Sequence, residues 1–417
     1  MQVLKFGGAS VQDIERIKQV ANIVQLYKNE QLLIVVSAIG KTTNALEKVV
    51  DAFYKQQPQT ALDLFSVIKN QHIQYAKYLL VVQYNSCTQK FNDVFTEVEW
   101  LLHDKPVRSY DYYYDQIVCV GELLSTILVE HYFRECLINS KWVDVRDILR
   151  TDNNFRDANI DWNKTKEAVT AINFNAAPIY VTQGFIGATD DNESTTLGRE
   201  GSDYSAAIFA NLLQADKLTI WKDVAGVMSA DPKQFPQAVL LNELNYEEVI
   251  EMAYYGAQVI HPKTIKPLQN KGIPLHVKCF LDTHLPGTII HNKSIKNLPP
   301  IYVIKSNQVL IHCSSQDFSF VGEQPMIDLY EMLKQLKVRP NILQTGAVSL
   351  QICFDDNTDK MEELAFAASN IFHVEVERNL QLLTIRHYSD EILNSLIKDK
   401  TVVLMQKTTS TVQVLYR

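Results

Sequence analysis

The sequence has few cysteines, and they are not arranged as a metal site or a disulfide framework. Six cysteines are scattered over 417 residues, with no Cys-x-x-Cys spacing and no Cys/His cluster. The chain also lacks any run of about 18 apolar residues, the length that a membrane-spanning helix needs. Its start, Met-Gln-Val-Leu-Lys-Phe-Gly-Gly, lacks the apolar stretch of a signal peptide. We therefore expect a cytoplasmic protein with reduced thiols and without structural zinc, disulfides or a membrane span.

An excess of positive charge is also missing. Lysine and arginine number 40 against 48 aspartates and glutamates, which gives a formal net charge of -8. This balance argues against nucleic acid or an anionic membrane surface as the main partner, so an anionic substrate would need a local positive site. Hydrophobic residues make up 46% and charged residues 21% of the chain, which is a globular composition. The length suggests two or three domains.

The chain opens with a strand, turn, helix and strand pattern. Val3 to Phe6 forms a strand-like segment before Gly7-Gly8, and a helical spacing follows as far as Tyr27. Leu32 to Val36 is apolar throughout, which is typical of a parallel strand buried on both faces. Further strands are expected at 142–145, 179–185, 218–221 and 273–280, with helices over most of 59–137. This alternation predicts a layered α/β domain with a mainly parallel sheet.

The pattern changes near Asn297-Leu-Pro-Pro-Ile301. Beyond it, short strands and helices fit two β-α-β-β units of about 60 residues each. The expected strands are 301–313, 347–354, 374–377, 380–385, 402–404 and 412–415, and the expected helices are 326–336, 360–371 and 390–397. We therefore place a domain boundary near residue 297.

The most informative segment is Thr-Thr-Leu-Gly-Arg-Glu-Gly-Ser-Asp-Tyr-Ser-Ala-Ala at 195–207. Its glycines allow a tight turn, and Ser202 or Asp203 is expected to cap the helix predicted by the apolar run that follows. A helix N-terminus with Arg199 beside it suits an anion such as a carboxylate or a phosphate. The alternative is a glycine-punctuated loop before an ordinary capped helix.

Lys5 is a candidate for phosphoryl transfer because it ends the first strand and precedes the bare backbone of Gly7 and Gly8. An exposed lysine before a sheet turn would give the same pattern. Gly40-Lys41-Thr42 resembles the end of a P-loop, but Val35 stands where the first glycine of that motif should be. We therefore do not interpret it as a P-loop.

Glu122 lies in the most apolar predicted helix, over 118–133, and is either a receptor for an ammonium group or a partly exposed carboxylate. The turn-rich segment 221–233 suits a loop that holds a nucleotide. His261, which stands alone before a proline, is interpreted as structural.

Taken in order, these segments resemble the aspartate kinases of the amino-acid kinase family. The matching motifs are Lys-Phe-Gly-Gly-Ala-Ser-Val at 5–11, Val-Ser-Ala-Ile-Gly-Lys-Thr-Thr-Asn at 36–44, Gly-Glu at 121–122, Gln-Gly-Phe-Ile-Gly at 183–187, the segment 195–207, Trp-Lys-Asp-Val-Ala-Gly-Val at 221–227 and His-Pro-Lys-Thr at 261–264. The resemblance implies a three-layer amino-acid kinase fold over 1–297, with an aspartate-binding part over about 1–200 and a nucleotide-binding part over about 201–297. It also implies tandem ACT-like, ferredoxin-like regulatory domains over 298–417.

The activity implied by the resemblance is transfer of the γ-phosphoryl group of ATP, with Mg²⁺, to the side-chain carboxylate of L-aspartate. The product would be 4-phospho-L-aspartate, at the entry to lysine, threonine and methionine biosynthesis. A carboxylate with a pKa of about 4 is already ionised at neutral pH, so the reaction needs no general base. It needs neutralised charge and in-line positioning.

The family pattern also implies roles for individual residues. It gives catalytic roles to Lys5 and Asp203, and no metal ligand among the side chains. The implied aspartate-binding residues are Ser37, Thr43, Glu122, Arg199 and Ser202, with Arg199 on the α-carboxylate and Glu122 on the α-ammonium group. The implied nucleotide-binding residues are Lys5, Gly7, Gly8, Lys222, Asp223, Met228, Lys233 and Gln258. A homodimer formed through the ACT region and an effector such as lysine or threonine complete the implied picture.

Several positions depart from the usual family pattern, namely Ala9, Glu200, Lys222, Met228, Lys233 and Gln258. Glu200, in place of a usual glycine, puts a negative charge next to Arg199, and we expect its side chain to point to solvent. Two alternatives stay open. One is another amino-acid kinase, acting on glutamate or acetylglutamate, and the other is a non-catalytic amino-acid sensor that keeps the ACT region.

Overall fold

The computed structural model describes residues 1–27, 29–317 and 319–417. The chain forms two compact units, each described by itself. Unit 1 comprises 1–227, 240–250 and 259–295, and unit 2 comprises 228–239, 251–258 and 296–417. The domain limits expected from the sequence stay a prediction.

Unit 1 is built on an eight-stranded sheet with the strand order β3-β4-β2-β1-β7-β9-β10-β8. Neighbouring strands are parallel except for the β9–β10 pair, which confirms the mainly parallel sheet. The strands are β1 (Gln2–Phe6), β2 (Leu32–Val36), β3 (Ser140–Trp142), β4 (Ile179–Gln183), β7 (Lys217–Lys222), β8 (Glu243–Asn245), β9 (Leu275–Cys279) and β10 (Thr288–His291). β5 (Ile186–Ala188) and β6 (Ser194–Thr196) form a separate hairpin.

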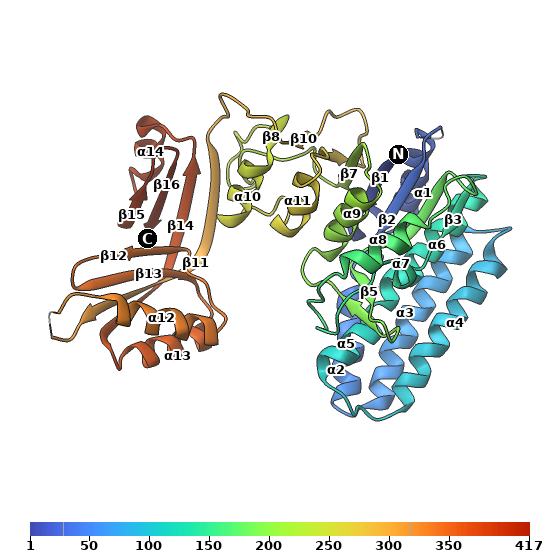
Figure 1. Ribbon diagram of the computed structural model, residues 1–417, viewed down its shortest axis with the longest axis horizontal. Coiled ribbons are helices and arrows are strands. Elements are labelled where there is room, and N and C mark those ends of the chain that lie inside the picture. The colour runs from blue at the N-terminus through green and yellow to red at the C-terminus, as the bar shows by residue number, and fades with distance from the viewer. Residues whose placement is uncertain (28, 318) are drawn as a thin grey trace. The chain divides into compact units, whose positions relative to one another are not determined.

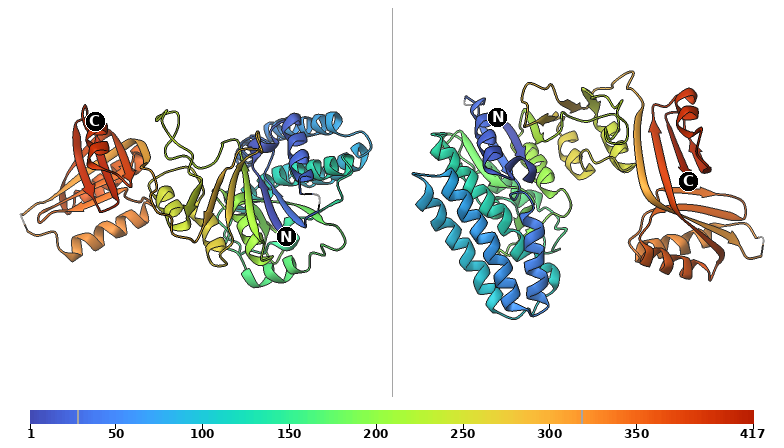
Figure 2. Two further views of the ribbon diagram at one scale, coloured as in Figure 1. Left: turned by 90° about the horizontal axis from the view of Figure 1, so that it is seen from above. Right: turned by 180° about the vertical axis from the view of Figure 1, so that it is seen from behind.

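Helices cover both faces of this sheet. α6 contacts β2, β3 and β4, whereas α9 contacts β1, β7 and α11, and the views in Figures 1 and 2 place these two groups on opposite faces. The helices of this part of the chain are η1 (Gly8–Val11), α1 (Ile14–Gln25), α2 (Thr42–Tyr54), α3 (Pro58–Leu79), α4 (Tyr84–His103), α5 (Tyr110–Val118), α6 (Val120–Glu135), α7 (Val145–Ile148), α8 (Trp162–Thr170), α9 (Gly201–Leu212), α10 (Tyr246–Tyr254) and α11 (Pro262–Gln269). The long pair α3 and α4 lies side by side beyond this layer, as expected for 59–137.

The sheet brings four strand ends together at one edge. β4, β2, β1 and β7 are parallel neighbours, so the segments that follow Gln183, Val36, Phe6 and Lys222 all leave the sheet on the same side. Ligands of open α/β sheets bind beyond the carboxyl ends of the strands. Below this edge, the rings of Phe6 and Trp221 stack with their centroids 6.1 Å apart.

Unit 2 contains one six-stranded antiparallel sheet with the order β12-β13-β11-β14-β16-β15. Its elements are β11 (Ile301–Ser315), α12 (Glu323–Gln335), β12 (Ile342–Thr345), β13 (Ser349–Asp355), α13 (Thr358–Ala368), β14 (Phe372–Arg386), α14 (Asp390–Ile397), β15 (Val402–Lys407) and β16 (Thr411–Tyr416). α12 and α13 cover one end of this sheet and α14 the other (Figure 1). The arrangement is consistent with two ACT-like units that share β11 and β14.

The sequence prediction missed β12 in this sheet and was wrong about β14. Residues 374–377 and 380–385 were expected to be two strands, but both belong to β14. Asn379, between them, has a φ of +62°, and the pairing of β14 with β11 shifts register nearby. The break in the sequence pattern therefore marks an irregularity inside one long strand rather than a turn.

The segment 228–239 belongs to the core of unit 2. Ala230 and Phe235 pack with Leu383, Ile385 and other side chains beneath α14. The rings of Phe235 and Tyr302 are stacked with their centroids 5.0 Å apart, and the Tyr302 N–H donates to the Ser229 carbonyl at 2.8 Å. This segment therefore completes the face of the sheet that α14 alone covers only in part.

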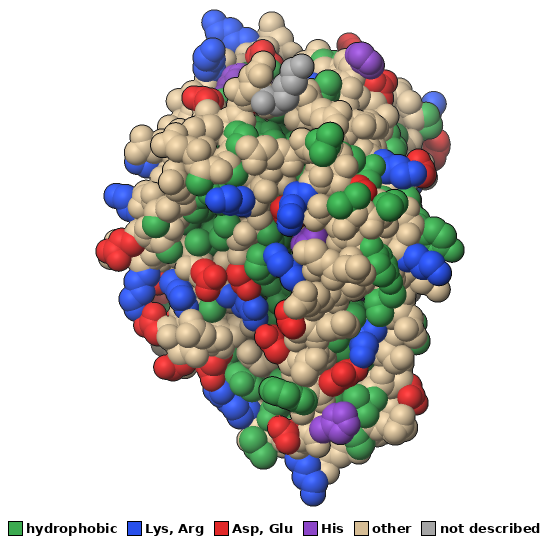
Figure 3. All heavy atoms as spheres, turned by 90° about the vertical axis from the view of Figure 1, so that its right-hand side faces the viewer, with side chains coloured by type: hydrophobic (Ala, Val, Ile, Leu, Met, Phe, Trp, Pro, Cys, Tyr) green, Lys and Arg blue, Asp and Glu red, His purple; other side chains and the backbone are tan. Residues whose placement is uncertain are grey.

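The surface mixes charges of both signs. On the face shown in Figure 3, acidic and basic side chains are interspersed with neutral and hydrophobic ones. In the part of the chain that the structure describes, we find no helix that combines the length and the apolar character needed to cross a bilayer.

Close packing at Gly184 gives a first testable prediction. A Cβ atom at Gly184 would lie 2.6 Å from the Cβ and 2.8 Å from the Cα of Ser202, in the first turn of α9. Because relief requires a backbone shift, we expect Gly184→Ala to lower the free energy of unfolding of unit 1 by about 1–3 kcal/mol. Urea unfolding followed by tryptophan fluorescence reports on this unit, because Trp100, Trp142, Trp162 and Trp221 all lie in it.

The matched control for Gly184→Ala is Ala176→Ser, at an exposed loop position of the same unit. We expect it to change the free energy of unfolding by less than about 0.5 kcal/mol. Equal midpoints for Gly184→Ala and the parent protein would contradict the close approach of α9 to this loop.

Candidate active site

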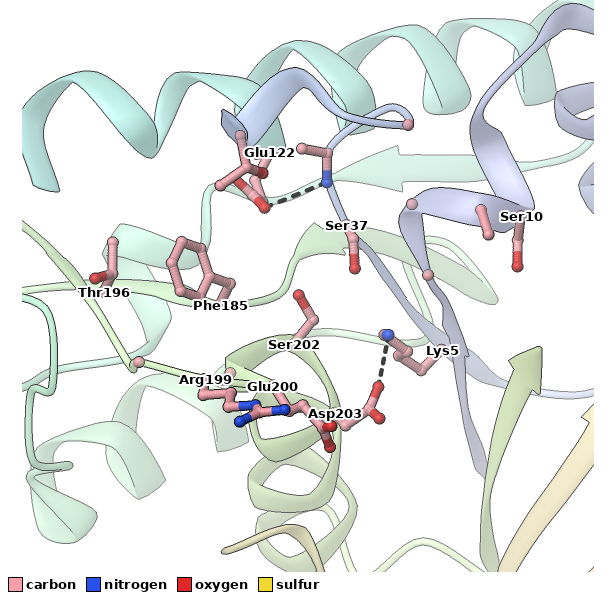
Figure 4. A pocket seen from close by; sticks show the side chains of 18 of the residues that line it. Lys5, Ser10, Ser37, Glu122, Phe185, Thr196, Arg199, Glu200, Ser202 and Asp203 are labelled. Carbon is pink, nitrogen blue, oxygen red and sulfur yellow. Dashed lines mark hydrogen bonds and ion pairs between the residues drawn. The ribbon is translucent and has the colours of Figure 1, made fainter. Parts of the chain in front are cut away.

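A cavity of about 660 Å³ lies at the carboxyl edge of the sheet, entirely within unit 1. This volume is in the range of small-molecule sites. The cavity brings together most of the residues singled out in the sequence, namely Lys5, Gly7, Gly8, Ser37, Thr43, Glu122, Arg199, Ser202, Asp203, Lys222 and Asp223. Figure 4 shows Glu122 and Arg199 on opposite sides of the cavity, with Ser37 and Ser202 between them.

Lys5 and Asp203 form an ion pair at the base of the cavity. The Lys5 Nζ lies 2.5 Å from Asp203 Oδ1, and both side chains are at least nine-tenths buried. Lys222 Nζ lies 3.9 Å from Asp203 Oδ2 and donates to the Val259 carbonyl at 2.7 Å. Burial opposes the ionisation of Asp203, but the two ammonium groups outweigh it and lower the pKa of this carboxyl. Lys5 is therefore not the exposed lysine that the sequence allowed as an alternative.

The helix that follows the Gly-Arg-Glu-Gly segment begins earlier than expected. Its N-cap is Glu200, with a φ of +55°, and Gly201 is its first residue. Ser202 and Asp203, predicted as caps, instead lie in the first helical turn with their side chains in the cavity. The left-handed backbone explains why a glycine suits position 200. The Glu200 side chain is exposed, as expected, and makes no capping hydrogen bond.

Glu122 is fully buried at the start of α6. Its Oε1 accepts from the Ala38 N–H at 3.3 Å, while its Oε2 has no hydrogen-bond partner among the described residues. Gly121 lets the helix approach this turn, because a Cβ there would lie 3.1 Å from the Ala38 Cβ. Burial raises the pKa of Glu122 to about 8, against smaller opposing effects of the Ala38 N–H and Lys5. A buried carboxylate with a free oxygen is suited to receive a cationic ligand group.

Arg199 offers the complementary charge. Its side chain is exposed to the cavity opening, and it has no ion-pair partner among the residues that the structure describes. Its guanidinium group can therefore bind a carboxylate in a bidentate manner. Thr43 lies in the first turn of α2 and lines the same cavity.

Three of the predicted nucleotide-binding residues do not line this cavity. Met228, Lys233 and Gln258 belong to unit 2, and their roles stay predictions. Lys222 and Asp223, at the end of β7, do line it. Among the residues that the structure describes, no three histidine, cysteine, aspartate or glutamate side chains gather as a metal site.

The cavity also contains residues to which the sequence analysis assigned no role, among them Tyr114, Arg156, Phe185 and Thr196. Phe185 lies in the Gln-Gly-Phe-Ile-Gly motif, so the sequence did mark its position. Thr196 is held by Asp115, which accepts from its N–H at 2.8 Å and its hydroxyl at 2.7 Å. Tyr114 and Arg156 lie in segments without a recognisable motif, and only the fold brings them to the site.

Comparison with known proteins identifies the family. Residues 1–279 match the model of the amino acid kinase family. The chain belongs to the amino acid kinase family. This result and the fold confirm the resemblance drawn from the ordered motifs.

The relatives in sequence include enzymes that are named aspartokinases. The chain is 29% identical to lysine-sensitive aspartokinase 3 of Escherichia coli over 395 residues, which cover 92% of this chain and 86% of that enzyme. It is 34% identical over 293 residues to a chloroplastic bifunctional aspartokinase/homoserine dehydrogenase of Arabidopsis thaliana. That match covers 69% of this chain but only 32% of the plant protein.

Solved structures agree with the sequence relatives. E. coli aspartokinase III in complex with aspartate and ADP superposes with a TM-score of 0.83 at 26% identity, covering all of this chain and 96% of that one. The same enzyme has also been solved with lysine and aspartate, and that structure superposes equally well.

The Lys5–Asp203 pair gives the second prediction. Lys5→Met leaves Asp203 buried, with only Lys222 nearby, so we expect unit 1 to lose about 3 kcal/mol of unfolding free energy. Adding Asp203→Asn should restore part of this loss, because a buried amide needs no counter-charge. A double-mutant cycle from urea unfolding measures the coupling between the two side chains.

Lys18→Met is the matched control for this cycle. Lys18 pairs with Glu15 at 2.7 Å on the exposed face of α1, and we expect a change below about 0.5 kcal/mol. Strict additivity of Lys5→Met and Asp203→Asn would show that the buried pair is not coupled energetically.

Proposed function

We propose that this chain is an aspartate kinase that transfers the γ-phosphoryl group of ATP to the side-chain carboxylate of L-aspartate. The observation that carries the proposal is one cavity that holds a buried carboxylate with a free oxygen, Glu122, the Lys5–Asp203 pair, and Arg199, which has no ion-pair partner among the described residues. L-Aspartate carries an ammonium group and two carboxylates. Glu122 would receive the ammonium group, Arg199 the α-carboxylate, and the side-chain carboxylate would then point to Lys5.

The proposed chemistry relies on charge neutralisation. The ionised side-chain carboxylate attacks the γ-phosphorus, a new P–O bond forms, and the bond to the bridging oxygen of ADP breaks. No proton has to be removed from the acceptor, which suits a cavity lined by neither histidine nor cysteine. The ammonium groups of Lys5 and Lys222 and the N-terminus of α9 would stabilise the charge that develops on the transferring group.

The phosphate chain would lie along the bare backbone of Gly7 and Gly8. A Cβ atom at Gly8 would lie 2.8 Å from the Ala38 carbonyl oxygen, so this turn admits no side chain. Mg²⁺ commonly binds through one or two carboxylates together with substrate phosphates. Asp203 and Asp223 are the aspartates that line the cavity, and they fit such a site. When bound, the metal would neutralise charge on the β- and γ-phosphates.

Regulation and assembly are further parts of the proposal. The relative in E. coli is described as lysine-sensitive. An amino-acid effector such as lysine or threonine at unit 2, and a homodimer formed through its ACT-like sheet, would be the corresponding properties of this chain. Titration of lysine, threonine and methionine into the assay below, and the mass of the protein in solution, test these two points.

The third prediction concerns the activity itself. ATP turnover is measured with aspartate, glutamate or no acceptor, and the acyl phosphate is trapped with hydroxylamine. We expect hydroxamate only with aspartate. Absence of aspartate-dependent hydroxamate would contradict the proposal, and turnover with glutamate alone would favour another amino-acid kinase.

The fourth prediction concerns pH. Glu122 must be ionised to bind the ammonium group, and its pKa of about 8 leaves it mostly protonated at pH 7 in the free enzyme. We therefore expect kcat/KM for aspartate to rise about tenfold per pH unit well below pH 8, to rise more slowly near pH 8, and to level off above about pH 9. Glu122→Gln should have a low and flat profile. A flat profile of the parent enzyme over this range would exclude the proposed role of Glu122.

A further inference from the structure

Arg156 lines the cavity although no sequence motif contains it. It lies in the loop before α8, and its backbone has a φ of +69°, a conformation that favours glycine. Its N–H donates at 3.0 Å to Asp115, the same carboxylate that holds Thr196. The loop is thereby fixed to the cavity wall by a buried side chain.

The backbone of Arg156 runs directly beside the segment that carries Arg199. The Ala158 N–H donates to the Thr196 carbonyl at 3.0 Å. A Cβ atom at Gly198 would lie 3.1 Å from the Arg156 carbonyl oxygen, so the two backbone segments are in contact there. Two arginines therefore leave adjacent backbone segments on the wall of one cavity.

The guanidinium group of Arg156 is positioned by neighbouring side chains but keeps N–H donors that can bind a ligand. Its Nη1 lies 3.0 Å from Asp111 Oδ1, and its Cζ lies 4.4 Å from the ring centroid of Tyr114, which also lines the cavity. The side chain remains 46% exposed. A guanidinium group has five N–H donors, so one contact with Asp111 leaves donors for a ligand.

We infer that Arg156 is a second arginine for the carboxylate of the phosphoryl acceptor and strengthens the selection of an acidic amino acid. The inference rests on the proposed function. Arg199 and Arg156 would grip one carboxylate from two sides, while Glu122 receives the ammonium group opposite. A non-glycine residue at a φ of +69° is conformationally unfavourable, and a contribution of its side chain to ligand binding accounts for its presence there.

Arg156→Gly tests the inference without endangering the fold, because glycine adopts the left-handed backbone conformation at no steric cost. The substitution removes only the side chain with its guanidinium group. We expect the KM for aspartate to rise about tenfold or more, as for the loss of a charge-assisted hydrogen bond, with kcat and the KM for ATP nearly unchanged. Arg156→Lys, which keeps the charge but not the fork, should recover part of the affinity. Thermal unfolding should show that Arg156→Gly is at least as stable as the parent.

Two further variants separate ligand binding from a structural role. Asp111→Asn breaks the ion pair but keeps the guanidinium group, so we expect a KM for aspartate within about twofold of the parent. Arg108→Ala is the matched control, because Arg108 also pairs with a carboxylate, that of Glu193, and lies over a tyrosine ring, that of Tyr112, but does not line the cavity. It should leave the KM for aspartate unchanged.

The inference is overturned if Arg156→Gly leaves the KM for aspartate unchanged, or if Asp111→Asn raises it as much as Arg156→Gly does. Either result, obtained with a parent enzyme that phosphorylates aspartate, leaves the proposed function intact. A parent enzyme that forms no aspartyl hydroxamate contradicts the proposed function instead, so the two failures are distinguishable.

Discussion

The ion pair between Lys5 and Asp203 is the contact on which the site depends. It joins the end of the first strand to the first turn of α9, two segments almost 200 residues apart in the sequence. Both charged side chains are buried. Removing either side chain would leave a buried charge that is not fully compensated, which is expensive. The pair thus fixes the helix N-terminus over the sheet edge and holds an ammonium group at the base of the cavity.

Burial gives the carboxylates around this pair different behaviour. Asp203 faces two lysines and stays ionised, whereas Glu122, with one backbone N–H and a free oxygen, has its pKa raised to about 8. Two carboxylates that line the same cavity are therefore suited to different partners. The first faces two lysines of the protein, and the second has an oxygen without a hydrogen-bond partner among the described residues.

Much of this arrangement was predictable from the sequence. β1 is a short strand before two glycines, β2 is a short apolar run before a serine, and α14 begins and ends at the residues expected from its spacing. The order of the motifs was enough to identify the family, and eleven of the fourteen positions implied by it line one cavity or its edge. The helix cap at Glu200 was not predictable, because propensity favours Ser202 or Asp203 and tertiary packing decides otherwise. Arg156 and Tyr114 were missed because nothing in their local sequence indicates a cavity.

Three residues of the cavity wall share a physical property that the sequence did not reveal. Arg156, Phe185 and Glu200 all line the cavity with positive φ, although none is glycine. Two of them are held by buried neighbours: Asp115 accepts from the N–H of Arg156, and the Ser205 hydroxyl accepts from the N–H of Phe185 at 3.0 Å. An unfavourable backbone conformation persists only where the surrounding structure holds it in place, and residues with such conformations cluster at functional sites. The wall that carries Arg199 is therefore built before any ligand binds, and an acceptor would meet preformed positions rather than order a flexible loop.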